Sequence, residues 1–205
     1  MPAADLPAFV APASGSLKAA SHSSNHPQRH PSSLRPAVES DAAALHSLAA
    51  DTFPLACPPG TRALEIERHI AAELSAERFA QFLADPAREL FVAHRDGELV
   101  GYTMLVYGEP TDAEVAGCLT VRPTVELSKC YFALSQHGTG ASAALIALTV
   151  AAARARGSAG MWLGVNEHNH RANRFYARHG FEAIGHKYFY VGTELNDDFV
   201  RELVL

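Results

Sequence analysis

The chain has 205 residues, of which 48% are apolar, and this combination predicts one domain with a normal core and excludes global disorder. The formal net charge of −5, without any block of lysines and arginines, argues against nucleic acid or an anionic membrane as the main partner. No apolar run reaches the ~18 residues of a membrane span, and three widely spaced cysteines favour free thiols in a reducing cytoplasm over a disulfide framework.

The N-terminal segment differs in composition from the rest of the sequence. Residues 1–33 are rich in Pro, Ala, Ser and His, and they show neither a sustained period nor the pattern of a secretory signal. This composition predicts a flexible leader with little part in the chemistry, and solvated low complexity explains its histidines better than metal binding does. A single folded domain is predicted from residue 34 to residue 205.

The first half of this domain alternates β-rich runs with helical periods. It opens with a short strand at 33–38 and a helix over 40–53, for which Ser40 or Asp41 is the candidate N-cap. The elements predicted next are two amphipathic helices over 61–74 and 75–86, a hairpin over 89–108 that turns at Asp96-Gly97, an irregular polar stretch over 109–123, and a strand over 125–134.

The second half begins with a Gly-rich turn that leads into a long helix ending at Gly157. The predicted inner stripe of this helix is Ala141, Ala144, Leu145 and Leu148. A short buried strand over 160–165 follows, then a helix within 169–181, and two final strands over 182–192 and 198–205. The pattern as a whole predicts an α/β domain of the α+β type, with helices on both faces of a mainly antiparallel sheet.

The Gly-rich turn before the long helix is a candidate anion site. Backbone N–H groups converge at a helix start, and glycines let a pyrophosphate approach the backbone without a Cβ in the way. Gly138-x-Gly140-x-x-Ala143 also satisfies the dinucleotide-binding fingerprint, and Glu167 stands about where an acidic ribose ligand is expected. That alternative is disfavoured, because residues 133–137 separate the strand from the first glycine and too few residues follow for the remaining strands and crossover helices.

Three motifs, "VELSKCYFALSQHGTGASAALIAL", "MWLGV" and "NHRANRFYARHGF", occur in this order. In their order and spacing the chain resembles the GNAT superfamily of acyl-CoA-dependent N-acetyltransferases. Within that superfamily, "MWLGVNEHNHRANRFYARHGFEAIGHKYFYVG" is most similar to bacterial spermidine/spermine N-acetyltransferases. The resemblance covers about residues 34–205 and implies a GNAT-like mixed sheet, acetyl-CoA as cosubstrate and no metal.

By this resemblance, the Gly-rich turn would hold the coenzyme A pyrophosphate, and the edge of the preceding strand would pair with the pantetheine amides. The cofactor-binding residues that it implies are Tyr131, Phe132, His137, Gly138, Thr139, Gly140, Ala141, Ser142 and Asn169. His137 and Ser142 depart from the family's usual Gln or Arg and Gly or Ala, which could weaken coenzyme affinity but leaves the backbone cradle intact. Cys130, on the same strand, is interpreted as an inert buried thiol.

Acetyl transfer to an amine requires an ammonium, with a pKa of about 10.4, to lose a proton and the departing thiolate to gain one. Glu126 stands where related enzymes often place their base, although a carboxylate that only solvates a strand end fits this position as well. Tyr176 matches the family's general acid, because its place on the inward helix face would aim the hydroxyl at the sulfur. A core tyrosine packed against Phe181 is the structural alternative, and both roles are compatible.

Two further sets of residues have weaker functional signals. Four histidines, at 168, 170, 179 and 186, invite a zinc hypothesis, but no thiolate accompanies them and they share no face, so we predict no metal. Glu65, Glu67 and Glu73 lie on the helices that line the acceptor pocket in this superfamily. They could attract a cationic amine, and a solvated helix face explains them equally well.

Sequence and resemblance together predict a cytoplasmic enzyme that transfers an acetyl group from acetyl-CoA to a primary amine, by direct attack in a ternary complex. The acceptor is a polyamine or another small amine, with a peptide amine or an amino-bearing antibiotic left open. A hypothesis of a different class is a catalytically silent acyl-CoA-binding module. The unusual His137 and Ser142 favour that module, whereas the retention of Glu126 and Tyr176 argues against it. A homodimer is also left open.

Overall fold

A seven-stranded sheet forms the centre of the computed structural model, which describes residues 33–57, 60–136, 140–191 and 194–205. Its strands are β1 (Ser33–Pro36), β2 (Arg88–Arg95), β3 (Glu98–Tyr107), β4 (Thr124–Phe132), β5 (Gly160–Asn166), β6 (Glu182–Val191) and β7 (Glu194–Val204). They lie in the order β1-β2-β3-β4-β5-β7-β6, and every neighbouring pair is antiparallel except β4 and β5, which run parallel. The predicted mixed, mainly antiparallel sheet is confirmed.

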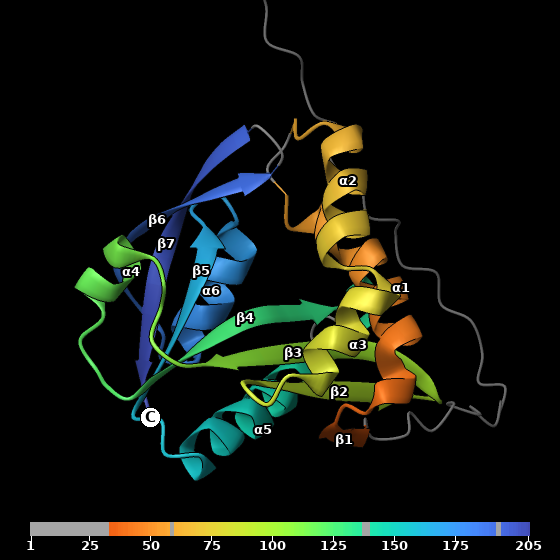
Figure 1. Ribbon diagram of the computed structural model, residues 1–205, viewed down its shortest axis with the longest axis horizontal. Helices are drawn as coiled ribbons and strands as arrows, with labels where there is room; N and C mark the ends of the chain where they lie inside the picture. Colours follow the sequence, from red (N-terminus) through yellow and green to blue (C-terminus); the bar gives the residue numbers. More distant parts are fainter. Residues whose placement is uncertain (1–32, 58–59, 137–139, 192–193) are drawn as a thin grey trace, which may run out of the picture.

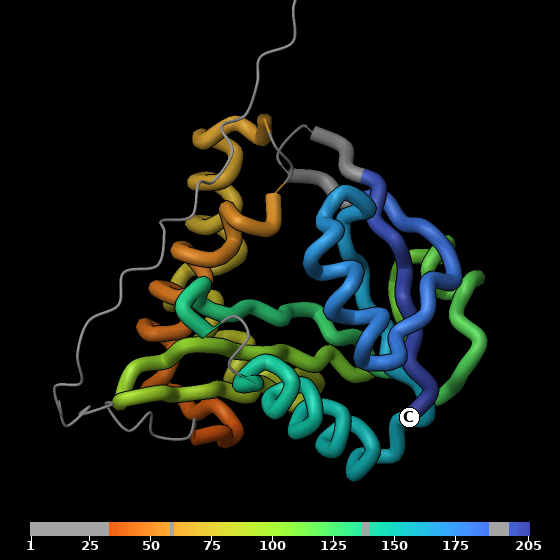
Figure 2. Tube along the Cα trace, turned by 180° about the vertical axis from the view of Figure 1, so that it is seen from behind, coloured from red at the N-terminus to blue at the C-terminus, as the bar shows by residue number. Residues whose placement is uncertain are grey.

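Helices cover both faces of this sheet, as Figures 1 and 2 show from opposite sides. The α-helices are α1 (Ala42–Thr52), α2 (Ala63–Glu73), α3 (Ala76–Ala84), α4 (Ala113–Cys118), α5 (Ala141–Ala155) and α6 (His170–Arg178). Helices α1 and α3 pack on one face of β2 and β3, whereas α5 packs on the opposite face of the same strands. None of the helices within the described ranges is long and apolar enough to cross a membrane.

The alternation of side chains along β2 divides the core into two clusters. Leu90 and Val92 point toward α1 and α3, where Phe79 and Leu45 are fully buried. Phe91 points the other way and belongs to the cluster that includes the buried side chains of α5 and α6. Side chains alternate along β2 between two layers that are both covered by helices, so β2 has no face toward solvent. This explains its continuous apolar run.

Two local predictions are confirmed by the backbone. Asp96 and Gly97, at the turn between β2 and β3, have φ values of 53° and 84°, so both central residues are left-handed, as a type I′ hairpin requires. At the start of α6 the Asn169 side chain accepts a hydrogen bond from the Ala172 N–H at 3.1 Å. This N-cap fixes the orientation of the helix that carries Tyr176.

Two details of the predicted elements were wrong, and a third holds only in part. The stretch predicted to be irregular contains α4, which Asp112 caps by accepting hydrogen bonds from two backbone N–H groups. On α5, Ala144 is exposed and the buried stripe continues instead through Thr149. Asp41 is the N-cap residue of α1, as one of the two predicted candidates, but its side chain makes no capping hydrogen bond to the helix, because its carboxylate pairs with Arg35 at 2.7 Å and accepts the Val38 N–H.

Gly101 on β3 allows the close approach of β4. A Cβ at this position would overlap the ring of Phe132, its register partner. Gly101→Ala is therefore expected to lower the free energy of unfolding by about 1–3 kcal/mol, because the ring must move in a packed layer. Chemical denaturation measures this change, with Gly117→Ala on exposed α4, where an added Cβ meets nothing within 4 Å, as the control. Equal effects of the two substitutions would contradict the packing argument.

Candidate active site

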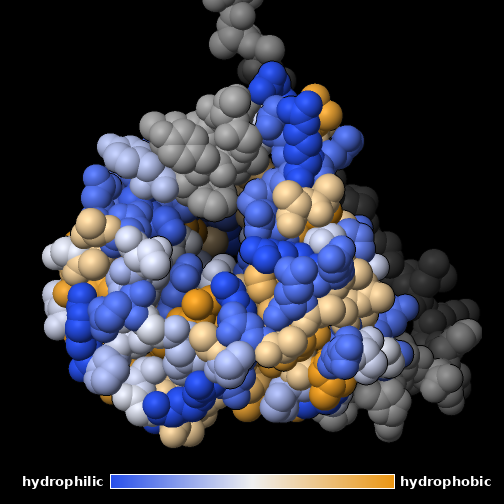
Figure 3. Space-filling view, in the orientation of Figure 1, coloured by the Kyte–Doolittle hydropathy of each residue, from blue (hydrophilic) through white to orange (hydrophobic). Residues whose placement is uncertain are grey.

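The two halves of the sheet join along a short seam and then separate. β4 and β5 pair only at Thr124 with Gly160, Val125 with Met161 and Glu126 with Trp162. Beyond Glu126, β4 continues to pair with β3, but its other edge has no strand partner among the described residues. A cleft with a volume of about 740 Å³ opens between the diverging strands, and the surface is hollowed near the middle of the face in Figure 3.

A bulge interrupts β4 where it lines this cleft. Leu105 pairs with Leu127 and Met104 pairs with Lys129, so Ser128 is an extra residue on β4. A bulge of this kind re-aims the side chains that follow it and leaves one residue out of the ladder. The free edge of β4 therefore presents backbone groups to the cleft at the point where the strands part.

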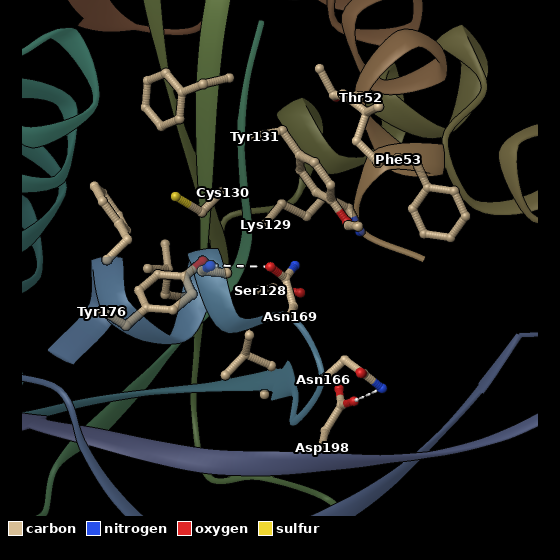
Figure 4. A pocket seen from close by; sticks show the side chains of 18 of the residues that line it. Thr52, Phe53, Ser128, Lys129, Cys130, Tyr131, Asn166, Asn169, Tyr176 and Asp198 are labelled. Atoms are coloured by element: carbon tan, nitrogen blue, oxygen red, sulfur yellow. Dashed lines mark hydrogen bonds between the residues drawn. The ribbon is translucent and has the colours of Figure 1, made fainter. Parts of the chain in front are cut away.

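The walls of the cleft come from segments that are far apart in the sequence. One wall consists of α1, the segment after it and α2; the other consists of the C-terminal end of β5 and α6, and β6 and β7 contribute at one end. Figure 4 shows Thr52 and Phe53 on the first wall and Tyr176 and Asn169 on the second, with β4 between them. Six of the candidate residues predicted from the sequence line this cleft: Glu126, Tyr131, Phe132, Ser142, Asn169 and Tyr176.

Tyr176 is a core residue that also lines the cleft. Its side chain is buried, and its ring meets that of Phe181 at a centroid distance of 5.7 Å. Burial raises the pKa of the Tyr176 hydroxyl well above its ordinary value, and a hydrogen bond to the Cys130 thiol raises it further. The hydroxyl therefore stays protonated near neutral pH while it lines the cleft, as a proton donor must.

Successive residues of β4 face opposite layers. Tyr131 stacks on Tyr102 at a centroid distance of 5.5 Å on the α1 side, whereas Phe132 packs with the α5 and α6 cluster. Burial raises the pKa of the Cys130 thiol to about 12, so this cysteine is a thiol rather than a thiolate, in agreement with its inert role. Figure 4 shows Cys130 and Tyr131 directed to different sides of the strand.

Glu126 occupies the last paired position before the strands diverge. It is half-buried, and its register partners are Val106 on β3 and Trp162 on β5. The neighbouring Lys129 ammonium interacts electrostatically with Glu126, and burial lowers the pKa of this lysine. A carboxylate is thus held at the apex of the cleft, next to a partly desolvated cation.

The predicted phosphate turn is only partly described. His137, Gly138 and Thr139 lie outside the described residues. Gly140 has a φ of 83°, immediately before α5 begins at Ala141, and among the described residues nothing lies within 4 Å of a Cβ added there. Gly140 therefore leaves open space next to the start of a 15-residue helix, where backbone N–H groups and the helix dipole favour an anion.

Of the three helical glutamates predicted for the acceptor pocket, only Glu73 lines the cleft. Glu65 is buried and pairs with Arg62 at 3.1 Å and Arg68 at 3.3 Å, which gives it a structural role on α2. Glu67 is exposed. Of the two alternatives left open by the sequence, the solvated helix face fits Glu67, and an ion pair within α2 accounts for Glu65.

The cleft also contains polar groups that the sequence did not single out. Lys187 on β6 and Asp198 on β7 line one end, together with Asn166 at the end of β5. His69 on α2 stacks flat on Phe53, with 4.4 Å between ring centroids. Side chains alternate between the two faces of a strand, and this alternation can be read from the sequence. The position of Lys187 and Asp198 at the cleft cannot, because it depends on the pairing of β5 with β7 and of β7 with β6.

The four histidines of the zinc hypothesis have separate surroundings. The Nδ1 atom of His179 bonds the Phe175 carbonyl, His186 pairs with Asp197 at 2.9 Å, and His168 lies beside Glu167. The described residues contain no group of three or more His, Cys, Asp or Glu side chains arranged to hold a metal ion.

The sequence comparison identifies the family. The model described as the acetyltransferase (GNAT) family matches residues 43–181. The chain belongs to this family. An uncharacterized N-acetyltransferase of Mycobacterium tuberculosis is 45% identical over 166 residues, which cover 80% of this chain and 99% of the relative. The GNAT assignment made from the motifs is therefore confirmed, and the chain is an N-acetyltransferase.

Solved structures agree with the GNAT fold. The PaiA N-acetyltransferase of Thermoplasma acidophilum, in complex with coenzyme A, has a TM-score of 0.70 and 17% identity, over 86% of this chain and all of that one. The NAA60 protein of Arabidopsis thaliana, in complex with a bisubstrate analogue, has a TM-score of 0.64 and 19% identity, over 85% of this chain and 98% of that one. The narrower likeness of this GNAT chain to spermidine/spermine N-acetyltransferases stays a prediction.

Proposed function

We propose that this GNAT enzyme transfers the acetyl group of acetyl-CoA to the primary amine of a small molecule, with a polyamine as the favoured class, by direct attack in a ternary complex. The observation that carries the proposal is a single cleft that joins an unpaired strand edge, a carboxylate and a protonated phenol. Acetyl-CoA supplies the activated acetyl group and a thiol leaving group. All other chemistry falls to residues of the chain.

The residues around the cleft fit an extended cosubstrate with a diphosphate. The free edge of β4, including Tyr131 and Phe132, offers backbone groups for pairing with amides. Asn169 and Ser142 line the same cleft, and Gly140 leaves room beside the start of α5. We assign the diphosphate site to the turn that leads into this helix. The proposed site includes His137, Gly138 and Thr139 of the turn and Ala141, the first residue of the helix.

Two residues have proposed roles in proton transfer. Glu126, at the apex of the cleft, accepts the proton that the acceptor ammonium must lose, directly or through water. Tyr176, which lines the same cleft and is protonated near neutral pH, donates its proton to the departing sulfur. Deprotonation of an ammonium with a pKa of about 10.4 costs roughly 4–5 kcal/mol near neutral pH, and a positioned base offsets this cost.

The release of free thiol from acetyl-CoA, measured over a panel of amines, tests this function. Acceleration by at least one small amine, with formation of its N-acetyl product, supports the enzyme. Tight coenzyme A binding without turnover on any small or peptide amine would instead support a silent acyl-CoA-binding module. Turnover on peptide N-termini alone would show that the acceptor is a peptide amine instead of a small amine, while acetyl transfer from acetyl-CoA would stand.

The diphosphate assignment has its own test on α5. Gly140→Ala is expected to raise the Kd for coenzyme A about tenfold or more, because the new Cβ strains a left-handed residue and occupies the open space beside the helix start. Gly157 also has a φ of 83° but follows the C-terminal end of the same helix. Gly157→Ala is therefore the matched control, and calorimetry should show its coenzyme affinity unchanged. Equal losses of affinity would place the diphosphate elsewhere.

A further inference from the structure

Asp198 is a buried carboxylate for which the proposed reaction has no role. Asp198 is 7% exposed, and it lies on the part of β7 that lines the cleft. Within the described part of the chain, its side chain accepts one long hydrogen bond, from Asn166 Nδ2 at 3.4 Å, and has no ion pair within 4.0 Å. A buried carboxylate normally has several donors or a close cation, so Asp198 retains acceptor capacity for a ligand in the cleft that it lines.

The nearest lysine does not fill this role. Lys187 is the register partner of Asp198, but its side chain crosses β5 at Gly164, where an added Cβ would lie 3.1 Å from Lys187 Cδ. Its Nζ atom lies 5.4 Å from the centre of the Trp162 ring. The ammonium is thus engaged with an aromatic face, and it affects Asp198 only at longer range.

The carboxylate also retains a proton more readily than an exposed aspartate does. Burial raises the pKa of Asp198 to about 6, and the negative charge of the adjacent Asp197 adds to this effect. Lys187 and Asn166 act in the opposite direction but do not cancel it. A cation bound at Asp198 would compensate the cost of burying its negative charge, so the site favours a positively charged group.

The register of β5 separates Asp198 from the proposed base. Glu126 pairs with Trp162, whereas Asp198 pairs with Asn166, four residues further along β5. At about 3.3 Å per residue, the two positions are ~13 Å apart along the strand, and their side chains can shorten the gap. Both carboxylates line one cleft, and Figure 4 shows Asp198 at one end of it, beside Asn166.

We propose that Asp198 binds a second ammonium group of the acceptor while the reacting amine lies at Glu126, which makes linear diamines and longer polyamines the preferred acceptors. This inference rests on the proposed function and adds a specificity-determining residue to it. A monoamine of the same chain length places a methyl group beside the buried carboxylate and leaves it uncompensated. A charge-assisted contact of this kind corresponds to about tenfold or more in kcat/KM.

A selectivity ratio measured within each variant tests the proposal. The probes are linear diamines from 1,4-diaminobutane to 1,8-diaminooctane, each compared with the n-alkylamine of equal length. We expect kcat/KM of the wild-type enzyme to favour at least one diamine about tenfold or more, and this ratio to fall to near one in Asp198→Asn. Because the ratio is taken within one protein sample, a partial loss of folded material cancels.

Asp197→Asn is the matched control. It removes the same charge from the adjacent residue, whose carboxylate pairs with exposed His186 instead of lining the cleft. Its diamine preference should equal that of the wild type. Amine turnover without any preference for diamines in the wild type overturns the inference alone, even if Asp198→Asn does not fold. Equal loss of preference in both variants also overturns it, whereas no turnover on any amine overturns the proposed function as well.

Discussion

Tyr176→Phe is expected to lower kcat for acetyl transfer by about 10²- to 10⁴-fold. The substitution removes only the hydroxyl, so the ring contacts with Phe175 and Phe181 remain and the fold should be retained. The loss follows from the proposed role, because Tyr176 lines the cleft with a protonated hydroxyl and phenylalanine has no proton to donate to the departing sulfur. Steady-state assays of thiol release, together with coenzyme A binding by calorimetry, separate a loss of chemistry from a loss of binding.

Tyr102 provides a matched control for this experiment. Its side chain is fully buried, and its hydroxyl has no hydrogen-bond partner in the described part of the chain. Tyr102→Phe removes an unsatisfied buried hydroxyl from a ring that lies behind Tyr131 and does not line the cleft, so activity should change little and stability should not fall. A Tyr176→Phe enzyme with wild-type kcat would show that the phenol is only a core residue.

Glu126→Gln is expected to lower kcat/KM by about 10²-fold or more near neutral pH. The amide keeps the shape of the side chain at the apex of the cleft but cannot accept the ammonium proton. The deficit should shrink as the pH rises toward about 10, because an amine with a pKa near 10.4 then deprotonates in solution without a base. A pH–rate profile with the preferred amine measures this narrowing.

Glu98→Gln is the corresponding control. Glu98 opens β3, is exposed and lies outside the residues that line the cleft. Its substitution removes the same charge, and its pH–rate profile should follow that of the wild type. If kcat/KM of Glu126→Gln were reduced by the same factor at every pH, Glu126 would have only a structural role at the cleft apex, and another group would be the base.

Local chemistry accounts for the parts of the fold that were predictable from sequence. Asp96-Gly97 specifies its turn through two left-handed residues, and Asn169 caps α6 through one side chain. Helix α4 was missed because its six residues are too few to show a helical period and only Val115 among them is buried. Ala144 was misplaced because α5 is apolar on nearly every side, so its sequence does not specify which face packs on the sheet.

The candidate site likewise contains residues that local sequence predicts and residues that depend on tertiary structure. Tyr176 and Asn169 lie within one helix and could be proposed from their spacing, whereas Asp198 depends on the pairing of β5 with β7. Two consecutive aspartates in a final strand were a signal that one of them points inward. Glu65 and Glu73 were equivalent by sequence, and only the rotation of α2 separates the buried ion pair from the cleft-lining carboxylate.

The free edge of β4 lies in the interior of the sheet rather than at its rim. A rim edge with unpaired backbone groups is a template for aggregation, and proteins protect such edges with charges, prolines or covering segments. Here α6 on one side and the segment after α1 on the other enclose the edge within the cleft. These walls exclude the strand of a neighbouring folded molecule and admit a slender flexible chain. The geometry that selects the ligand thus also protects the ligand-free protein against self-association through this strand.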